Sequence, residues 1–184
     1  MNDEIDFKIL NKKKENQVSS FDNNNFKCGH FEIKILKDGT WLYKNSPISR
    51  IEIVKLFSSV LKLDSDGCYY LETPVEKGII DVEDAPFTIT NMDVENFEGN
   101  QVITFYTNLG DKVIVSDKNP IFMELRKEKK AYLPYVVVRK NLKGLIVRSI
   151  YYDLVELAVK DIEDQSLYGV WSNKFFFRLG KVDW

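Results

Sequence analysis

The chain is poor in the residues that most often carry catalytic or metal chemistry. Its 184 residues include one histidine, His30, and two cysteines, Cys28 and Cys68. A zinc site needs three or four ligands, and a Cys–His catalytic pair needs a third group that orients it. Gly67 and Gly78 stand alone, so no glycine-rich phosphate loop is present. We therefore predict no catalytic residues, no metal site and no cofactor, and expect Cys28 and His30 to be structural residues at a strand start.

Long apolar runs and a strong net charge are also absent. No run reaches the length of a membrane span, and the first residues, Met-Asn-Asp-Glu, are acidic where a signal peptide is basic. Two cysteines do not make a disulfide framework, so the expected compartment is the cytoplasm. The formal net charge of −2 argues against binding to a nucleic acid polymer, which needs a broad basic face.

Residues 31–77 form the unit around which the chain is organised. Apolar and polar residues alternate over 31–35, which is the period of a half-buried strand. Asp38-Gly39 then predicts a tight hairpin, because glycine accepts a positive φ angle at little cost. The returning strand at 41–43 alternates in the same way, and Pro47 closes it.

A helix is predicted next, and its start carries a capping signal. Ser49 and Glu52 match a capping box, in which each side chain accepts a hydrogen bond from a backbone N–H of the other residue. We expect this cap to contribute about 1 kcal/mol. Apolar residues at helical spacing predict one buried face, made of Ile53, Leu56, Phe57, Val60 and Leu61. The turn residues 64–67 follow the helix, and a strand at 68–71 completes the unit.

The rest of the chain predicts more strands and a second copy of the same unit. Residues 78–125 alternate apolar and polar residues between turns and predict an antiparallel meander. The order of strand, turn, strand, capped helix and strand recurs at 135–177, with Ser149 as the second cap. This second helix is predicted to run to about Val159, with Ile150, Leu154, Leu157 and Ala158 on one apolar face. We interpret this order as an internal duplication, although such units are also common in unrelated α+β proteins.

The predicted fold is α+β, with mostly antiparallel sheet and two principal helices. We divide the chain into a loosely ordered N-terminal arm (1–27), a β-β-α-β half (28–77) and a β-rich half with one helix (78–184). The arm is rich in Asn, Lys and Asp, a composition that does not build a packed core.

Ten short motifs occur in a fixed order along the chain. They are Cys28-Gly29-His30-Phe31, Asp38-Gly39-Thr40-Trp41, Ser46-Pro47-Ile48, Leu56-Phe57-Ser58-Ser59-Val60-Leu61, Thr73-Pro74-Val75-Glu76-Lys77, Val82-Glu83-Asp84-Ala85-Pro86-Phe87, Thr107-Asn108-Leu109-Gly110-Asp111, Pro134-Tyr135-Val136-Val137-Val138-Arg139, Tyr151-Tyr152-Asp153-Leu154-Val155-Glu156-Leu157-Ala158 and Gly169-Val170-Trp171-Ser172. Together they resemble a bacterial family catalogued as domain of unknown function 1285, over roughly residues 28–180.

The resemblance implies a duplicated core whose C-terminal half is superficially like a pleckstrin-homology fold. It also implies a nucleotide-like ligand site between the two halves and a role in signal transduction. The family has no established activity, so the resemblance informs the fold better than the function.

Charge is distributed unevenly along the sequence. Residues 76–98 hold seven acidic residues and one basic residue, whereas residues 126–148 hold eight basic residues and one acidic residue. One interpretation is attraction between two faces of the protein. The other is a basic cleft for an anionic ligand, since guanidinium groups bind phosphate through forked donors.

The predicted ligand site collects residues near the two helix starts and the strand ends. Helix N-termini attract anions, and an aromatic ring can stack on a base. The candidate residues are Trp41, Arg50, Glu76, Lys77, Arg139 and Arg148. For a single aromatic residue such as Trp41, packing in the core is the commoner role.

The leading function is a non-enzymatic ligand-binding or regulatory protein that binds a nucleotide-type anion between its halves. The first alternative is a protein-interaction module without a small ligand, which an exposed apolar patch would indicate. The second alternative is an unrecognised enzyme.

We predict that Cys28 and Cys68 are not bonded to each other in the cell, because cytosolic thiols stay reduced. Alkylation of the unfolded chain without reductant, followed by mass spectrometry, is expected to find both thiols modified. Recovery of a disulfide-linked peptide pair would contradict this prediction.

Overall fold

The computed structural model describes residues 28–126 and 131–181. The predicted arm at 1–27 lies outside these described residues. Fifteen strands and two helices follow one another in the described chain: β1 (Cys28–Ile35), β2 (Trp41–Tyr43), β3 (Ser46–Pro47), α1 (Ile51–Ser59), β4 (Leu61–Leu63), β5 (Tyr69–Glu72), β6 (Lys77–Val82), β7 (Phe87–Phe97), β8 (Asn100–Thr107), β9 (Lys112–Ile114), β10 (Ile121–Arg126), β11 (Ala131–Arg139), β12 (Leu142–Ile146), α2 (Arg148–Glu156), β13 (Val159–Lys160), β14 (Leu167–Ser172) and β15 (Phe175–Lys181).

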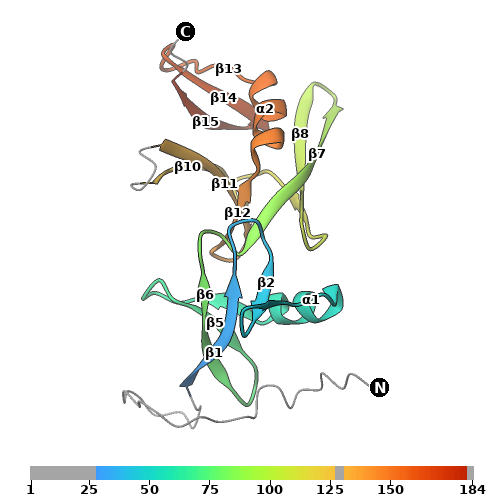
Figure 1. Ribbon diagram of the computed structural model, residues 1–184. Helices are drawn as coiled ribbons and strands as arrows, with labels where there is room; N and C mark the ends of the chain where they lie inside the picture. The colour runs from blue at the N-terminus through green and yellow to red at the C-terminus, as the bar shows by residue number, and fades with distance from the viewer. Residues whose placement is uncertain (1–27, 127–130, 182–184) are drawn as a thin grey trace.

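The first half of the chain is built on a six-stranded sheet with the order β3-β2-β1-β6-β5-β4. The predicted hairpin between β1 and β2 is confirmed, with Ile35 opposite Trp41 and Gly39 at a φ of +87°. Strand β6 returns parallel to β1, so this sheet extends to Val82. The hairpin turn lies at the end of the sheet that faces the second half (Figure 1).

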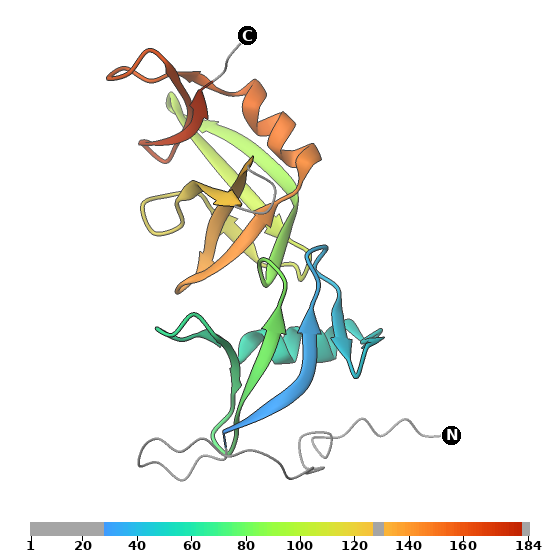
Figure 2. The same ribbon diagram turned by 60° about the vertical axis from the view of Figure 1, so that its left-hand side comes forward.

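The second half holds a six-stranded sheet with the order β10-β11-β12-β7-β8-β9 and a separate three-stranded sheet with the order β13-β14-β15. Strands β7 and β8 form a long antiparallel hairpin, and β12 runs parallel to β7. Helix α2 lies beside this hairpin and the small sheet, as the two views show (Figures 1 and 2). The predicted α+β class, mostly sheet with two helices, is therefore confirmed.

The predicted recurrence of elements is confirmed in order. Each half contains an antiparallel strand pair, then a nine-residue helix, then an antiparallel group of strands. The two units differ in how their last strands pair. In the first, β6 joins β1 in one sheet, whereas β14 and β15 belong to the separate three-stranded sheet.

Both predicted helix caps are wrong. Helix α1 has Arg50 at its N-cap and α2 has Val147, and neither of these described helices has a side-chain hydrogen bond at that position. Ser49 lies one residue before the N-cap of α1, and Ser149 is the second residue of α2. The first helical hydrogen bonds are accepted by the backbone carbonyls of Arg50 and Val147. Because no side chain caps either helix, packing of the apolar faces determines where the helices begin.

The apolar face predicted for α1 is also partly wrong. Val54 and Ser58 are its buried residues, and Phe57 packs partly against the core. Leu56, predicted to be buried, is 48% exposed. The helix ends at Ser59, earlier than predicted, and Leu61 begins β4. For α2 the prediction is better, because Ile150 and Leu154 are both buried.

One hydrophobic cluster runs through both halves. It joins Ile35 and Trp41 of the first sheet with Phe87 and Phe105 of the second. Ser172 is the most notable polar residue in this interior, at 0% exposed. Its Oγ accepts a hydrogen bond from the Ile103 N–H at 2.9 Å and donates one to the Val115 carbonyl at 2.8 Å. This hydroxyl therefore links the three-stranded sheet to β8 and to Val115, the residue after β9.

We expect Ser172→Ala to lower the free energy of unfolding by about 1–3 kcal/mol, because it leaves a buried N–H and a buried carbonyl without a partner. Ser49→Ala is the matched control and should change stability by less than about 0.5 kcal/mol. Equilibrium urea unfolding measures both. If Ser49→Ala lowers the free energy of unfolding by about 1 kcal/mol or more, Ser49 caps the helix after all. If Ser172→Ala leaves the free energy of unfolding unchanged, the two buried hydrogen bonds of Ser172 do not stabilise the fold.

Candidate functional site at the junction of the two halves

The structure places Trp41 in the core, where it is 2% exposed. Its ring stacks against Phe57 with centroids 6.5 Å apart. A base cannot reach either face of the indole without opening the first half. The predicted role of Trp41 in stacking a ligand is therefore not supported by this position, and the commoner core role fits.

Arg139 lies where the two halves meet. One guanidinium nitrogen donates to Asp111 Oδ1 at 2.9 Å, and the other donates to the carbonyl oxygen of Ser58 at 2.7 Å. Ser58 is in the last turn of α1, where its carbonyl also accepts a backbone N–H, so this arginine adds a charged donor at the C-terminal end of the helix. The guanidinium carbon lies 4.8 Å from the centre of the Phe87 ring. Both terminal nitrogens of the guanidinium group are therefore hydrogen-bonded within the protein.

The other four predicted residues lie at separate places. Arg50 and Arg148 are exposed at the starts of α1 and α2, in different halves of the molecule (Figure 1). Arg148 contacts Tyr152 on its own helix. Lys77 pairs with Asp64 at 2.9 Å, and the backbone of Glu76 bonds to Thr73 in the turn before β6.

Polar contacts join the two halves directly. Asn108 Nδ2 donates to the carbonyl oxygen of Gly39 at 3.2 Å, and Asn141 Nδ2 donates to that of Leu63 at 2.9 Å. Gly39 is required here for a second reason besides its positive φ. A Cβ at this position would lie 2.6 Å from the Asn108 amide nitrogen, so only glycine allows this close approach.

A cluster of charged and aromatic side chains lies on the face of β10, β11 and β12 that meets the first half. We call it the junction cluster, and its members are Tyr69, Asp84, Phe122, Glu124, Arg126, Tyr135 and Lys143. Tyr69 comes from β5 and Asp84 from the segment that connects β6 with β7. The cluster therefore gathers residues from both halves.

The hydroxyl of Tyr135 is the centre of the junction cluster. It donates to Asp84 Oδ1 at 2.7 Å and accepts a hydrogen bond from Arg126 Nε at 3.0 Å. Arg126 also forms an ion pair with Asp84, whose side chain is only 9% exposed. The ring of Tyr135 stacks on Phe122 with centroids 5.7 Å apart, and Lys143 Nζ lies 4.3 Å from its centre. Lys143 is in turn paired with Glu124.

Burial raises the pKa of Tyr135 above its ordinary value, although the Arg126 hydrogen bond opposes this rise. Burial also raises the pKa of Tyr69, and the nearby Glu124 carboxylate raises it further. Both phenols are therefore protonated at neutral pH, and that of Tyr135 donates its proton to Asp84. Two cations, two carboxylates and two phenols make this a balanced polar site beside an aromatic stack.

The sequence indicated this site only in outline. Arg126 and Lys143 both belong to the basic segment at 126–148, which pointed to a basic surface. Asp84 lies in the acidic segment at 76–98, so its ion pair with Arg126 fits the first interpretation, attraction between the two segments. Glu124 lies in neither segment, and no local pattern predicts its pairing with Lys143. The sequence predicts only that Tyr135 lies in a strand, because no sequence pattern indicates that a phenol is buried.

Other residues considered for chemistry lie elsewhere. The His30 imidazole faces the Asp81 carboxylate at 3.7 Å, and Cys68 has a free thiol. The side chain of Cys28 is outside the described part of the structure. Within the described residues, no group of three or more His, Cys, Asp and Glu side chains is placed to hold a metal ion. Neither described helix is long and apolar enough to cross a membrane.

The fold and the junction cluster define a two-part protein of mostly antiparallel sheet, and the comparisons with known proteins identify its class. The family model for the N-terminal domain of DUF1285, a domain of unknown function, matches residues 22–85. The model for the C-terminal domain of the same family, a protein of unknown function, matches residues 86–179. The chain therefore belongs to the DUF1285 family, and the resemblance seen in its motifs is confirmed.

Two crystal structures of this family are similar to the chain. A DUF1285 family protein from Silicibacter pomeroyi DSS-3 is 39% identical, with a TM-score of 0.78, over 86% of this chain and 85% of the other. A second family protein, from Shewanella baltica OS155, is 28% identical, with a TM-score of 0.52, over 68% of this chain and 91% of the other. No curated protein matches the sequence.

The contacts of Arg139 lead to a prediction about its role. We expect Arg139→Ala to lower the free energy of unfolding by about 1–3 kcal/mol, because the Asp111 carboxylate and the Ser58 carbonyl both lose a charged donor. Arg148→Ala is the control, since this arginine is exposed and, among the described residues, bonds to Tyr152 on its own helix. It should change stability by less than about 0.5 kcal/mol. Thermal and urea unfolding measure both variants. If Arg139→Ala and Arg148→Ala change stability by the same amount, the structural role of Arg139 is contradicted.

Proposed function

We propose that the protein is a non-enzymatic binding protein that takes a nucleotide-like anion at the junction of its two halves. The observation that carries this proposal is the junction cluster, which brings two cations, two phenols and an aromatic stack together from both halves. Phosphate is bound by such charged donors. Tyr135 is fully buried, so the half-buried rings of Tyr69 and Phe122 are the aromatic surface that a planar base would contact. The predicted location between the halves is kept, while the residues assigned to it change.

Lys143 is the residue best placed to receive the anion. Among the described residues, its ammonium group is held by the Glu124 carboxylate and by the face of Tyr135. The Glu124 side chain is 41% exposed, so it can turn into solvent when a phosphate takes its place on Lys143. Arg126 is bound more firmly, because it pairs with the nearly buried Asp84 and with the Tyr135 hydroxyl. Binding is thus an exchange of one anion for another at Lys143.

A regulatory role follows from where the ligand would sit. An anion held between Lys143 of β12 and Tyr69 of β5 would contact both halves, so its binding energy would favour one arrangement of the halves. This is the basis on which we propose a function in signal transduction. The pleckstrin-homology-like character of the second half and the cytoplasmic location belong to the same proposal.

Titration calorimetry of the full chain with a panel of nucleoside mono-, di- and triphosphates tests the proposed function. Lys143→Gln should weaken binding of the tightest nucleotide by about tenfold or more, because a charged hydrogen bond is lost. Glu124→Gln should strengthen it by about threefold or more, since the competing carboxylate is gone. Opposite effects of two neighbouring substitutions are not expected from loss of folding.

The control for this experiment is Arg148→Ala, which removes an exposed arginine on α2 and should leave the affinity unchanged. Circular dichroism and thermal unfolding verify that each variant keeps its fold. Absence of heat with every nucleotide would overturn the proposal. So would an affinity that Lys143→Gln leaves unaltered.

A further inference from the structure

The three-stranded sheet carries aromatic residues on its outer face. Val170 and Phe177 lie opposite each other and are both buried, so they face the core. The next pair, Trp171 and Phe176, therefore points to the other side of the sheet, since side chains alternate along a strand. A sheet face that meets solvent normally carries polar residues. Trp171 is instead 40% exposed there.

The backbone of the sheet holds this aromatic pair in place. The two ring centroids are 5.2 Å apart and the ring planes meet at 52°. Phe176 also lies close to Gly169 on the neighbouring strand. A Cβ at Gly169 would come within 2.6 Å of the Phe176 ring and 2.4 Å of the Phe177 carbonyl oxygen. Glycine at this position therefore lets the Phe176 ring lie against the sheet and beside Trp171.

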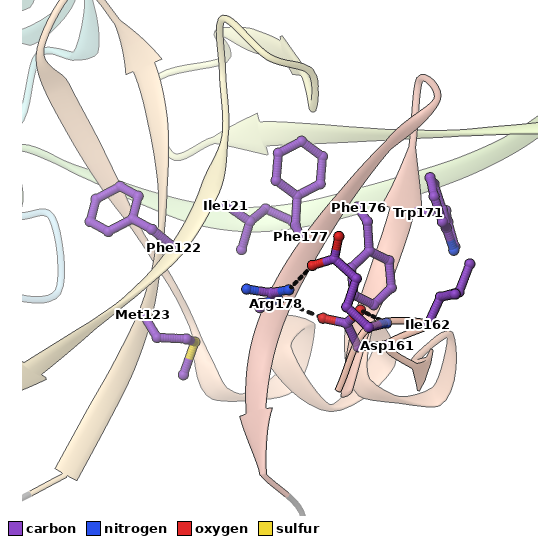
Figure 3. A pocket seen from close by; sticks show the side chains of 10 residues that line it. Ile121, Phe122, Met123, Asp161, Ile162, Trp171, Phe176, Phe177 and Arg178 are labelled. Atoms are coloured by element: carbon purple, nitrogen blue, oxygen red, sulfur yellow. Dashed lines mark hydrogen bonds and ion pairs between the residues drawn. The ribbon is translucent and has the colours of Figure 1, made fainter. Parts of the chain in front are cut away.

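A pocket of about 760 Å³ lies next to this aromatic pair. Strands β10 and β15 contact each other, and both contribute side chains to the pocket. Figure 3 shows Met123 of β10 and Trp171 of β14 on opposite sides of Arg178. Most of the lining side chains are apolar or aromatic, and three are charged. A volume of this size with mostly apolar walls and a few polar groups is typical of a site for a small molecule.

The charged side chains of the pocket leave an excess of negative charge. Arg178 donates to Asp161 Oδ2 at 2.5 Å and to Glu163 Oε2 at 2.9 Å (Figure 3). The Glu163 backbone N–H donates to the other oxygen of Asp161 at 2.9 Å. This backbone bond lowers the pKa of Asp161, and the bond from Arg178 lowers it further, so this carboxylate is ionised at neutral pH. Two carboxylates therefore share one guanidinium group.

The two carboxylates differ in their access to solvent. The Asp161 side chain is 5% exposed and is fixed by its bonds, whereas the Glu163 side chain is 83% exposed. Glu163 can therefore accept a second cation without uncovering a buried group. Ile162 lies between them in the sequence, lines the pocket and is 79% exposed, so apolar surface lies beside the accessible carboxylate.

We propose that this pocket binds a small organic cation with an aromatic or apolar body, of the arylalkylammonium class. The ammonium group pairs with Glu163 and lies over the exposed indole of Trp171, because tryptophan is the aromatic side chain that attracts cations most strongly. The body of the ligand contacts Phe176 and Met123. An anion of the same shape is disfavoured, since it meets two carboxylates and one guanidinium group that is already bonded to both.

The pocket and the junction cluster are neighbours, because Phe122 belongs to both. They require ligands of opposite charge, so the charge of the ligand distinguishes them. Glu163 and Trp171 lie outside the junction cluster. Substitutions at these two positions therefore report on the pocket alone.

Titration of the ¹⁵N-labelled full chain with three indole compounds tests the proposal. Tryptamine, tryptophol and indole-3-propionate share the ring and the two-carbon linker, but end in a cation, a neutral hydroxyl and an anion. The indole N–H signal of Trp171, assigned by its absence in Trp171→Phe, reports binding. Tryptamine should bind about fivefold or more tightly than tryptophol, because an ion pair and a cation–π contact both favour it. Indole-3-propionate should bind most weakly.

Substitutions at Glu163 test whether this carboxylate selects the cation. Glu163→Gln should reduce the advantage of tryptamine over tryptophol to about twofold or less, since the ion pair is lost and the contact with Trp171 remains. Glu163→Lys should reverse the order, so that indole-3-propionate binds more tightly than tryptamine. Glu95→Gln is the matched control, because Glu95 is an exposed carboxylate on β7 and does not line the pocket. It should leave all three affinities unchanged.

Thermal unfolding verifies that each variant keeps its fold, which is expected because Glu163 is exposed. A tryptamine titration that gives no saturable shift at Trp171 would overturn the proposal. Equal affinities for tryptamine and tryptophol would do the same, as would an advantage of tryptamine that Glu163→Gln leaves unchanged.

Discussion

The buried hydroxyl of Tyr135 imposes the constraint on which the junction depends. A phenol that is 0% exposed must find hydrogen-bond partners inside the protein, because an unpaired buried group is costly. It finds Asp84 on the segment that connects the halves and Arg126 at the end of β10. Satisfying this one group therefore fixes the connecting segment against the second sheet. Arg139 and Asn108 add direct bonds to the first half.

Local patterns predicted the features that local chemistry controls. Asp38-Gly39 predicted the hairpin correctly, because the tight turn needs a positive φ at residue 39 in any tertiary context. Alternation and helical spacing correctly predicted the order of elements and the buried residues of α2. The capping box at Ser49 failed, since the position of α1 is set by packing of Val54 and Phe57 against the core and not by its end.

The sequence indicated part of the charge pairing in the junction cluster but not the cluster itself. Arg126 and Asp84 lie in the basic and acidic segments whose attraction was one interpretation, whereas Lys143 pairs with Glu124, which lies in neither segment. Which cation meets which carboxylate depends on contacts between residues far apart in the chain, such as Tyr135 with Asp84 and Arg139 with Ser58.

Chemical shift mapping tests the central claim, that the junction of the two halves is the ligand site, most directly. Backbone amide spectra of the ¹⁵N-labelled full chain are recorded as the tightest nucleotide of the panel is added. If the junction binds the ligand, the largest shifts will lie at Tyr69, Arg126 and Lys143, on strands from both halves. Largest shifts at Trp171 and Phe176, or shifts confined to one half, would contradict it.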